Sequence, residues 1–234
     1  APAGAKAGGL GFAVDLAGDL APLFLPDYAV FFGDRIALTA NGTRWADGRL
    51  DLAGLSLNAR AINLNGQLAL GADGLPQRFD LTGRIADPSG APVLLPIASD
   101  TQTRVESANL KLHFDAKTDD GWGGDITVRG VDRDDFQAAE IGLNGSGRIA
   151  RVAGAPVVGG TLNFLGLGLM PADANLARAL GPSVTGQASF RWRQGDGSLS
   201  VQKLELAGAD YAASFFGKIS GLNDALKIMG TARV

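Results

Sequence analysis

Residues 108–115, ANLKLHFD, alternate apolar and polar side chains without a break. The two leucines and Phe114 fall on one parity. The polar residues fall on the other, and they are Asn109, Lys111, His113 and Asp115. Because successive side chains of a β-strand point to opposite faces, this stretch predicts a strand with one apolar and one polar face. One polar face favours an antiparallel sheet over a parallel sheet that is covered by helices.

The same alternation recurs along most of the chain, and it predicts an all-β fold built on one long, curved, mainly antiparallel sheet. We count roughly twelve to fourteen strands by this pattern. The residues predicted to share the apolar face are Phe12, Val14, Leu16, Ile62, Leu64, Leu68, Leu70, Phe79, Leu81, Ile85, Leu110, Leu112, Phe114, Ile126, Val128, Ile141, Leu143, Leu162, Phe164, Phe190 and Trp192.

Turn signals separate the alternating runs at short spacing. The pairs Asn41-Gly42, Asp47-Gly48, Asp73-Gly74 and Asp196-Gly197, together with residues 88–90 and 119–121, contain residues that tolerate positive φ. We therefore expect a tight turn at each. Within residues 50–57 and 199–206 the apolar parity changes midway, which predicts a β-bulge in each segment.

One short helix is expected near residues 173–181, inside an insert that covers 171–182. Asp173 is a candidate N-cap, Gly181 occupies the position after the helix, and Pro182 prevents its continuation. The helix is short, so we expect it to be docked on the sheet.

The chain has 34 glycines. They occur not only in turns but also on the apolar parity of the predicted strands. Gly18, Gly66, Gly83, Gly145, Gly186 and Gly217 stand in units of apolar-x-Gly-x-apolar. Glycine within a strand marks a bend or a close approach by a backbone or a ligand. Two interpretations stay open: these glycines only let the sheet curl, or they also leave room for a ligand.

Composition excludes several classes of function. The net charge of -3 provides no basic surface for nucleic acid, and the chain has no Cys and a single His. The longest apolar stretch, residues 162–170, is far shorter than the roughly 20 residues of a membrane-spanning helix. The chain begins Ala1-Pro2 without an initiator Met, so we expect residues 1–234 to be one β segment excised from a longer protein.

No arrangement of residues suggests catalysis, a cofactor or a metal. His113 lies on the polar parity and is expected to be a surface histidine. Asp132, Asp134 and Asp135 lack the spacing of a calcium-binding EF-hand loop and are expected to form a solvated turn. We therefore expect a protein that is not an enzyme.

Several segments resemble the TamB family of bacterial translocation and assembly modules, within the AsmA-like, bridge-like lipid-transfer proteins. They are the Leu/Val-x-Gly repeat, residues 79–85 (FDLTGRI), residues 95–97 (LPI), residues 108–115 leading to Gly121-Trp122, and residues 168–173 (GLMPAD) continuing to 179–182 (ALGP). The resemblance covers most of the chain and is one of pattern, without a catalytic signature.

The resemblance implies a periplasmic trough (a β-taco), open along one side, in a protein anchored in the inner membrane. It implies that the apolar residues above and the six glycines line a groove for phospholipid or other acyl-chain lipid. An outer-membrane barrel partner (TamA-like) would bind regions outside residues 1–234. Two alternatives stay open: a scaffold that assists outer-membrane proteins by β-augmentation, and an ordinary closed β-sandwich binding module.

Overall fold

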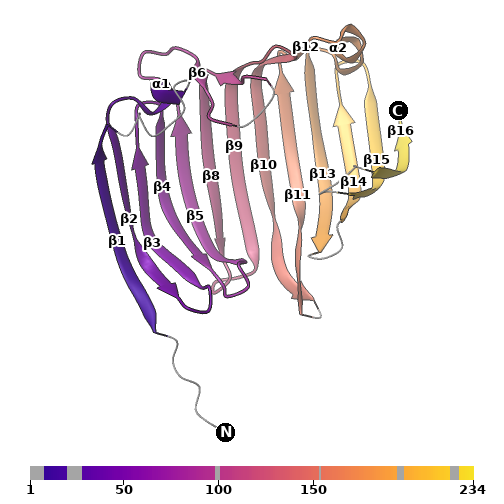
Figure 1. The fold of residues 1–234 in the computed structure, drawn as a ribbon. Coiled ribbons are helices and arrows are strands. Elements are labelled where there is room, and N and C mark those ends of the chain that lie inside the picture. Colours follow the sequence, from indigo (N-terminus) through magenta and orange to yellow (C-terminus); the bar gives the residue numbers. More distant parts are fainter. Residues whose placement is uncertain (1–7, 20–27, 98–100, 153, 194–197, 222–226) are drawn as a thin grey trace.

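The structure is a computed structural model that describes residues 8–19, 28–97, 101–152, 154–193, 198–221 and 227–234. It is all-β, and its strands form one antiparallel sheet of 16 strands (Figure 1). Within the described residues the sheet does not close on itself, because β1 and β16 each pair with one neighbour. The expected all-β antiparallel class is confirmed, and the closed β-sandwich is not the observed architecture.

Thirteen strands follow one another along the main path of the sheet. They are β1 (Gly9–Gly18), β2 (Ile36–Trp45), β3 (Leu50–Asn58), β4 (Ile62–Leu70), β5 (Pro76–Ile85), β8 (Ser107–Asp115), β9 (Gly121–Asp132), β10 (Phe136–Val152), β11 (Ala155–Leu167), β13 (Ser183–Arg193), β14 (Ser198–Ala207), β15 (Ala212–Ser220) and β16 (Lys227–Arg233). The remaining elements are β6 (Val93–Leu94), β7 (Arg104–Val105), β12 (Met170–Pro171), α1 (Ala29–Phe32) and α2 (Ala174–Leu180).

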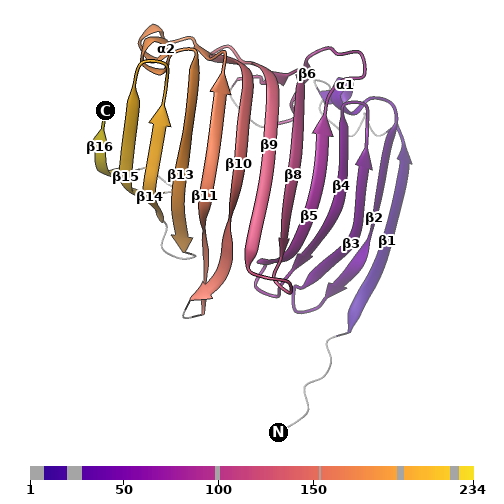
Figure 2. The same cartoon turned by 180° about the vertical axis from the view of Figure 1, so that it is seen from behind.

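The two ends of the strands differ in what connects them. The end at the top of Figure 1, which we call the upper margin, has α1, β6, β7, β12 and α2 in its connections. The opposite end, the lower margin, has short turns after β2, β4 and β8, and Figure 2 shows the same division from behind. In an antiparallel sheet every second connection lies at the same margin. The connections that contain α1, β6, β7, β12 and α2 therefore all lie at the upper margin.

Both predicted bulges are confirmed by breaks in the strand register, between Leu52 and Leu55 and between Val201 and Leu204. The prediction of a turn at Asn41-Gly42 is wrong, because both residues lie inside β2. The register shifts between them, and a Cβ on Gly42 would lie 3.1 Å from the Cα of Leu52. Glycine is needed here for close approach of two strands, and not for a turn. The Asp196-Gly197 pair lies outside the described residues.

The predicted helix forms as α2, and its N-cap is the expected Asp173. The carboxylate of Asp173 accepts hydrogen bonds from the backbone N–H groups of Asn175 and Leu176. The helix ends at Gly181, whose φ is +68°. α1 was not predicted, because a single turn of four residues has no readable periodicity and depends on packing of its buried Phe31.

Six of the ten buried apolar residues in the described part of the chain form two small clusters at the upper margin. Phe31, Ala61 and Val93 form the first cluster, and Val105 and Val131 with Ala138 form the second. Over much of the described sheet the apolar side chains are only half-buried, since they pack against neighbours in the same layer. The stability of the fold therefore depends strongly on contacts between adjacent strands.

Candidate functional site

The strand register defines the two faces of the sheet. Leu112 lies directly between Leu81 of β5 and Gly124 of β9, and residues directly opposite one another share a face. We call this side the Leu112 face and the other side, which carries Lys111, the Lys111 face.

Following the register from strand to strand places every residue of the predicted apolar set, and each of the six glycines, on the Leu112 face. One row across the sheet illustrates this arrangement. It runs Leu16, Leu38, Leu57, Leu64, Gly83, Leu110, Ile126, Leu143, Phe164, Gly186 and Leu206.

Several further residues lie on the same face. The predicted apolar set contained no residue of β2, β3, β14 or β15, and these strands contribute to the face as well. The added residues are Leu38, Leu52, Leu55, Leu57, Trp122, Val201, Leu204, Leu206, Phe215 and Ile219. Trp122 stands in a glycine-rich segment without alternation, and its pairing with Phe114 places it on this face.

The space above several glycines of this face is filled by large side chains. A Cβ on Gly145 would lie 2.5 Å from a methyl of Leu162 and 3.2 Å from the indole of Trp122. A Cβ on Gly160 would lie 2.6 Å from the same indole. Trp122 therefore lies flat over a floor of glycines that β10 and β11 provide.

The same arrangement recurs at the other end of the sheet, where Phe215 covers Gly217 and Gly230. A Cβ on either glycine would lie within 2.7 Å of its ring. At these positions the room above the glycine is already occupied by a neighbouring ring. The structure therefore argues against open space for a ligand at these four glycines, and it adds a role that the sequence did not predict, the accommodation of a large neighbouring side chain.

Aromatic rings gather toward the lower margin of the Leu112 face. The ring centroids of Phe79 and Phe114 are 5.5 Å apart, and those of Trp122 and Phe190 are 6.3 Å apart. The indole Nε1 of Trp122 donates a hydrogen bond to the carbonyl of Gly159 at 3.2 Å. Because this bond satisfies the polar end of the indole, the large ring can lie against the sheet.

The Lys111 face is polar over the same strands. Asp125 stands opposite both Lys111 and Asn144, and Asn144 donates to its carboxylate at 2.8 Å. On β3 and β4, Ser56, Asn58, Asn63 and Asn65 form a closed ring of four side-chain hydrogen bonds. These hydroxyl and amide groups satisfy one another at the surface.

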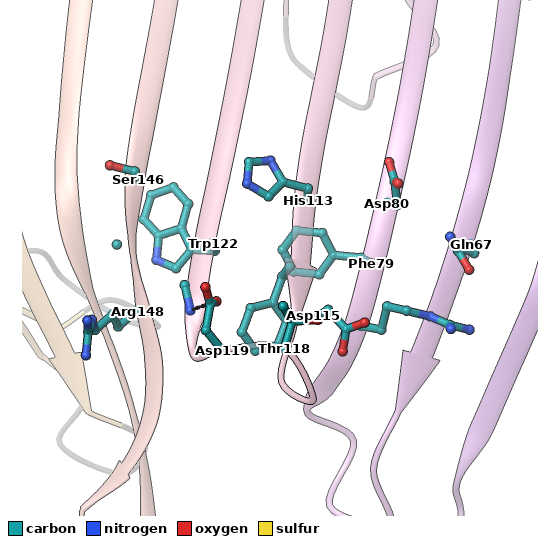
Figure 3. A pocket seen from close by; sticks show the side chains of 14 residues that line it. Gln67, Phe79, Asp80, His113, Asp115, Thr118, Asp119, Trp122, Ser146 and Arg148 are labelled. Carbon is teal, nitrogen blue, oxygen red and sulfur yellow. Dashed lines mark hydrogen bonds between the residues drawn. The ribbon is translucent and has the colours of Figure 1, made fainter.

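A recess of 580 Å³ near the lower margin is lined by residues of β4, β5, β8, β9 and β10 (Figure 3). Gln67, Asp80, His113 and Ser146 belong to one row of the Lys111 face, with Gly123 between His113 and Ser146. The imidazole of His113 and the hydroxyl of Ser146 therefore lie two strands apart along the row, which is about 10 Å. This spacing does not provide the adjacent base and nucleophile of covalent catalysis.

The acidic and histidine side chains of the described part of the chain form no group of three or more that could hold a metal ion. His113 is exposed, as predicted. In the predicted turn after β9, the carboxylate of Asp135 pairs with Arg133 at 2.8 Å, and this partner lowers the pKa of Asp135.

Two ion pairs join separate turns. At the upper margin the guanidinium of Arg60 lies 2.8 Å from the buried carboxylate of Asp87, which also accepts two hydrogen bonds from Ser89. Arg60 above all, and then Ser89, hold the pKa of Asp87 well below its ordinary value. At the lower margin Arg151 pairs with Asp73 and lowers the pKa of its carboxyl.

Among the described residues, none of the helices is both long enough and apolar enough to cross a membrane. Comparison with family models, with curated proteins and with solved structures finds no match to this chain.

Proposed function

We propose that the Leu112 face is the concave, apolar wall of a trough that carries lipid acyl chains. The protein would then be a periplasmic segment of a lipid-transfer bridge between the inner and outer membranes, supporting outer-membrane biogenesis. The observation that carries the proposal is the row of apolar side chains and glycines that the register connects from β1 to β14. The resemblance to the AsmA-like lipid-transfer proteins supports it.

The energetics of lipid transfer explain why such a wall suffices without catalytic groups. Exposure of one methylene to water costs about 0.8 kcal/mol, so two acyl chains with about 30 methylenes cost on the order of 24 kcal/mol. A continuous apolar surface removes much of this cost at every step along the path. Thirteen strands at a spacing of about 4.8 Å provide a path of about 58 Å.

We propose no cofactor and no catalytic residue, and we assign the inner-membrane anchor and the TamA-like partner to other parts of a longer protein.

The experiment compares two arginine substitutions on adjacent residues of β8. Leu112→Arg places a charge on the proposed wall, while His113→Arg places it on the opposite, polar face. Native mass spectrometry of each purified protein then counts bound phospholipid. We expect Leu112→Arg to lose most bound lipid and His113→Arg to retain it, with both proteins keeping the β-sheet circular dichroism spectrum. Absence of lipid from the unaltered protein, or equal retention in both variants, contradicts the proposal.

A second candidate function rests on the two end strands. In the described sheet β1 and β16 each have one paired edge, and both carry exposed apolar side chains such as Leu10 and Ile228, 75% and 66% exposed. A scaffold for outer-membrane proteins could add a client strand to such an edge. Photo-crosslinking to an unfolded outer-membrane protein would then label β1 or β16, and absence of labelling from both end strands contradicts the scaffold.

A further inference from the structure

At the lower margin an ion pair connects two segments that lie several strands apart in the sheet. Arg151, near the tip of the β10–β11 hairpin, pairs with Asp73 in the turn after β4. Strands β5, β8 and β9 lie between these two partners in the sheet. The backbone N–H of Ile149 also donates to the carbonyl of Asp120 in the turn after β8, at 2.8 Å. We call the Asp73–Arg151 pair the clasp.

The clasp covers the lower part of the Leu112 face over β5, β8 and β9. Phe114, which belongs to this face, is only 2% exposed. It lines a cavity of 370 Å³ together with Pro76, Ile149 and Pro156, which come from the two segments near the clasp. Because these segments meet beside Phe114, this side chain is covered, and at β8 the open part of the Leu112 face ends before it.

The upper part of the same face is covered from the other margin. Val93 of β6 pairs with Val105 of β7, and Leu95 donates its backbone N–H to the carbonyl of Thr103. Leu95 and Ile85 both pack against the two buried clusters, and Val128 and Ile141 pack against the cluster of Val105. We call this pair of short strands with Leu95 the strap.

Between the clasp and the strap, β8 leaves two residues of the Leu112 face uncovered, Leu110 and Leu112. They belong to two neighbouring rows, which are about 6.8 Å apart because alternate residues of a strand are separated by twice its rise. On β13, by contrast, Val184, Ala188, Phe190 and Trp192 lie on this face with Gly186. None of these β13 residues is buried as Phe114 is, so the open face is narrower at β8 than at β13.

From this geometry we infer that the open part of the Leu112 face narrows at β5–β9 and that this narrow part, which we call the waist, selects lipids by their number of acyl chains. The inference rests on the proposed function and specifies its substrate. Extended chains lie about 4–5 Å apart, slightly more than the contact distance of two carbon atoms, so two chains side by side fit within two open rows about 6.8 Å apart. A lipid with one or two chains passes, whereas a lipid with four or six chains would need the rows under the clasp and the strap.

The test compares labelling inside and outside the waist. A photoreactive p-benzoylphenylalanine replaces either Leu112 in the waist or Leu204 on β14, and the chain is incubated with lysophospholipid, phospholipid, cardiolipin or lipid A. We expect the first two lipids to label both positions. We expect cardiolipin and lipid A to label position 204 at least about tenfold more than position 112. Equal labelling of both positions by lipid A overturns the waist while leaving the lipid conduit intact.

A second comparison tests the clasp itself. Arg151→Ala removes the clasp, and Arg148→Ala is the matched control, because the ion pair of Arg148 among the described residues is with Asp120 in the adjacent turn, at 3.4 Å. We expect Arg151→Ala to increase labelling of position 112 by lipid A severalfold, and Arg148→Ala to leave it unchanged. An unchanged pattern in Arg151→Ala contradicts the role of the clasp. Phospholipid labelling at neither position overturns the proposed function, and with it the waist.

Discussion

Replacement of Gly147 by alanine tests whether the glycines of the Leu112 face are covered by neighbouring side chains. Gly147 lies on β10 between Trp122 of β9 and Gly160 of β11. A Cβ there would lie closest to the backbone oxygen of Gly159, and it would also lie 2.5 Å from the Cα of Gly160 and 2.7 Å from the indole Nε1 of Trp122. Both the backbone of β11 and the indole must therefore shift, and the hydrogen bond from the indole to Gly159 is lost.

The expected magnitude follows from three contributions. Overpacking costs about 1–3 kcal/mol, and loss of the hydrogen bond costs about 1 kcal/mol. The alanine restricts the unfolded chain and returns about 0.4–1 kcal/mol. We therefore expect Gly147→Ala to reduce the free energy of unfolding by about 2 kcal/mol, close to the middle of these ranges.

Gly142→Ala is the matched control, since Gly142 lies on the same strand but on the Lys111 face. Its added Cβ would meet only the Cβ of Leu165 at 3.6 Å, an ordinary contact. We expect this variant to be unchanged or to gain about 0.5 kcal/mol. Guanidinium denaturation followed by circular dichroism measures both. Equal effects of the two substitutions would refute the packing of Trp122 over Gly147 and would restore the interpretation of open room for a ligand.

Three further substitutions test the margins of the sheet. Phe114→Ala should lower the free energy of unfolding by about 3–5 kcal/mol, whereas Phe216→Ala, at a ring 56% exposed, should change it far less; similar losses would contradict the closure beside Phe114. Val105→Ala, in the strap, should cost about 2 kcal/mol because the side chain is 1% exposed, and a thermal melt unchanged from that of the unaltered chain would count against a packed strap. The lowered pKa of Asp87 means that its carboxylate stabilises the fold fully above the ordinary value of 3.8, and that this contribution is lost as the pH falls below it. Asp87→Asn should therefore flatten the acid side of a stability-against-pH profile, and a profile as steep as that of the unaltered protein would show that the Arg60–Asp87 pair is not coupled to folding.

The sequence alone determined the class of the fold and the face on which each regular strand places its apolar residues. Strict alternation, as in residues 108–115, leaves few other structures possible, because the period of a strand is fixed by its backbone. Local capping chemistry likewise determined α2, since Asp173 and Gly181 act within a single turn of chain. The bulges in β3 and β14 were also readable, because each reverses the parity of the leucines around it.

Only the tertiary structure decided what lies above the glycines and which rows are covered. The Asn41-Gly42 pair has the composition of a turn, yet the neighbouring strand makes it part of β2. Trp122 acquires its place from glycines on two other strands, and Arg151 meets a partner 78 residues away. Such contacts depend on the register of strands that are distant in sequence, and a one-dimensional pattern carries no record of that register.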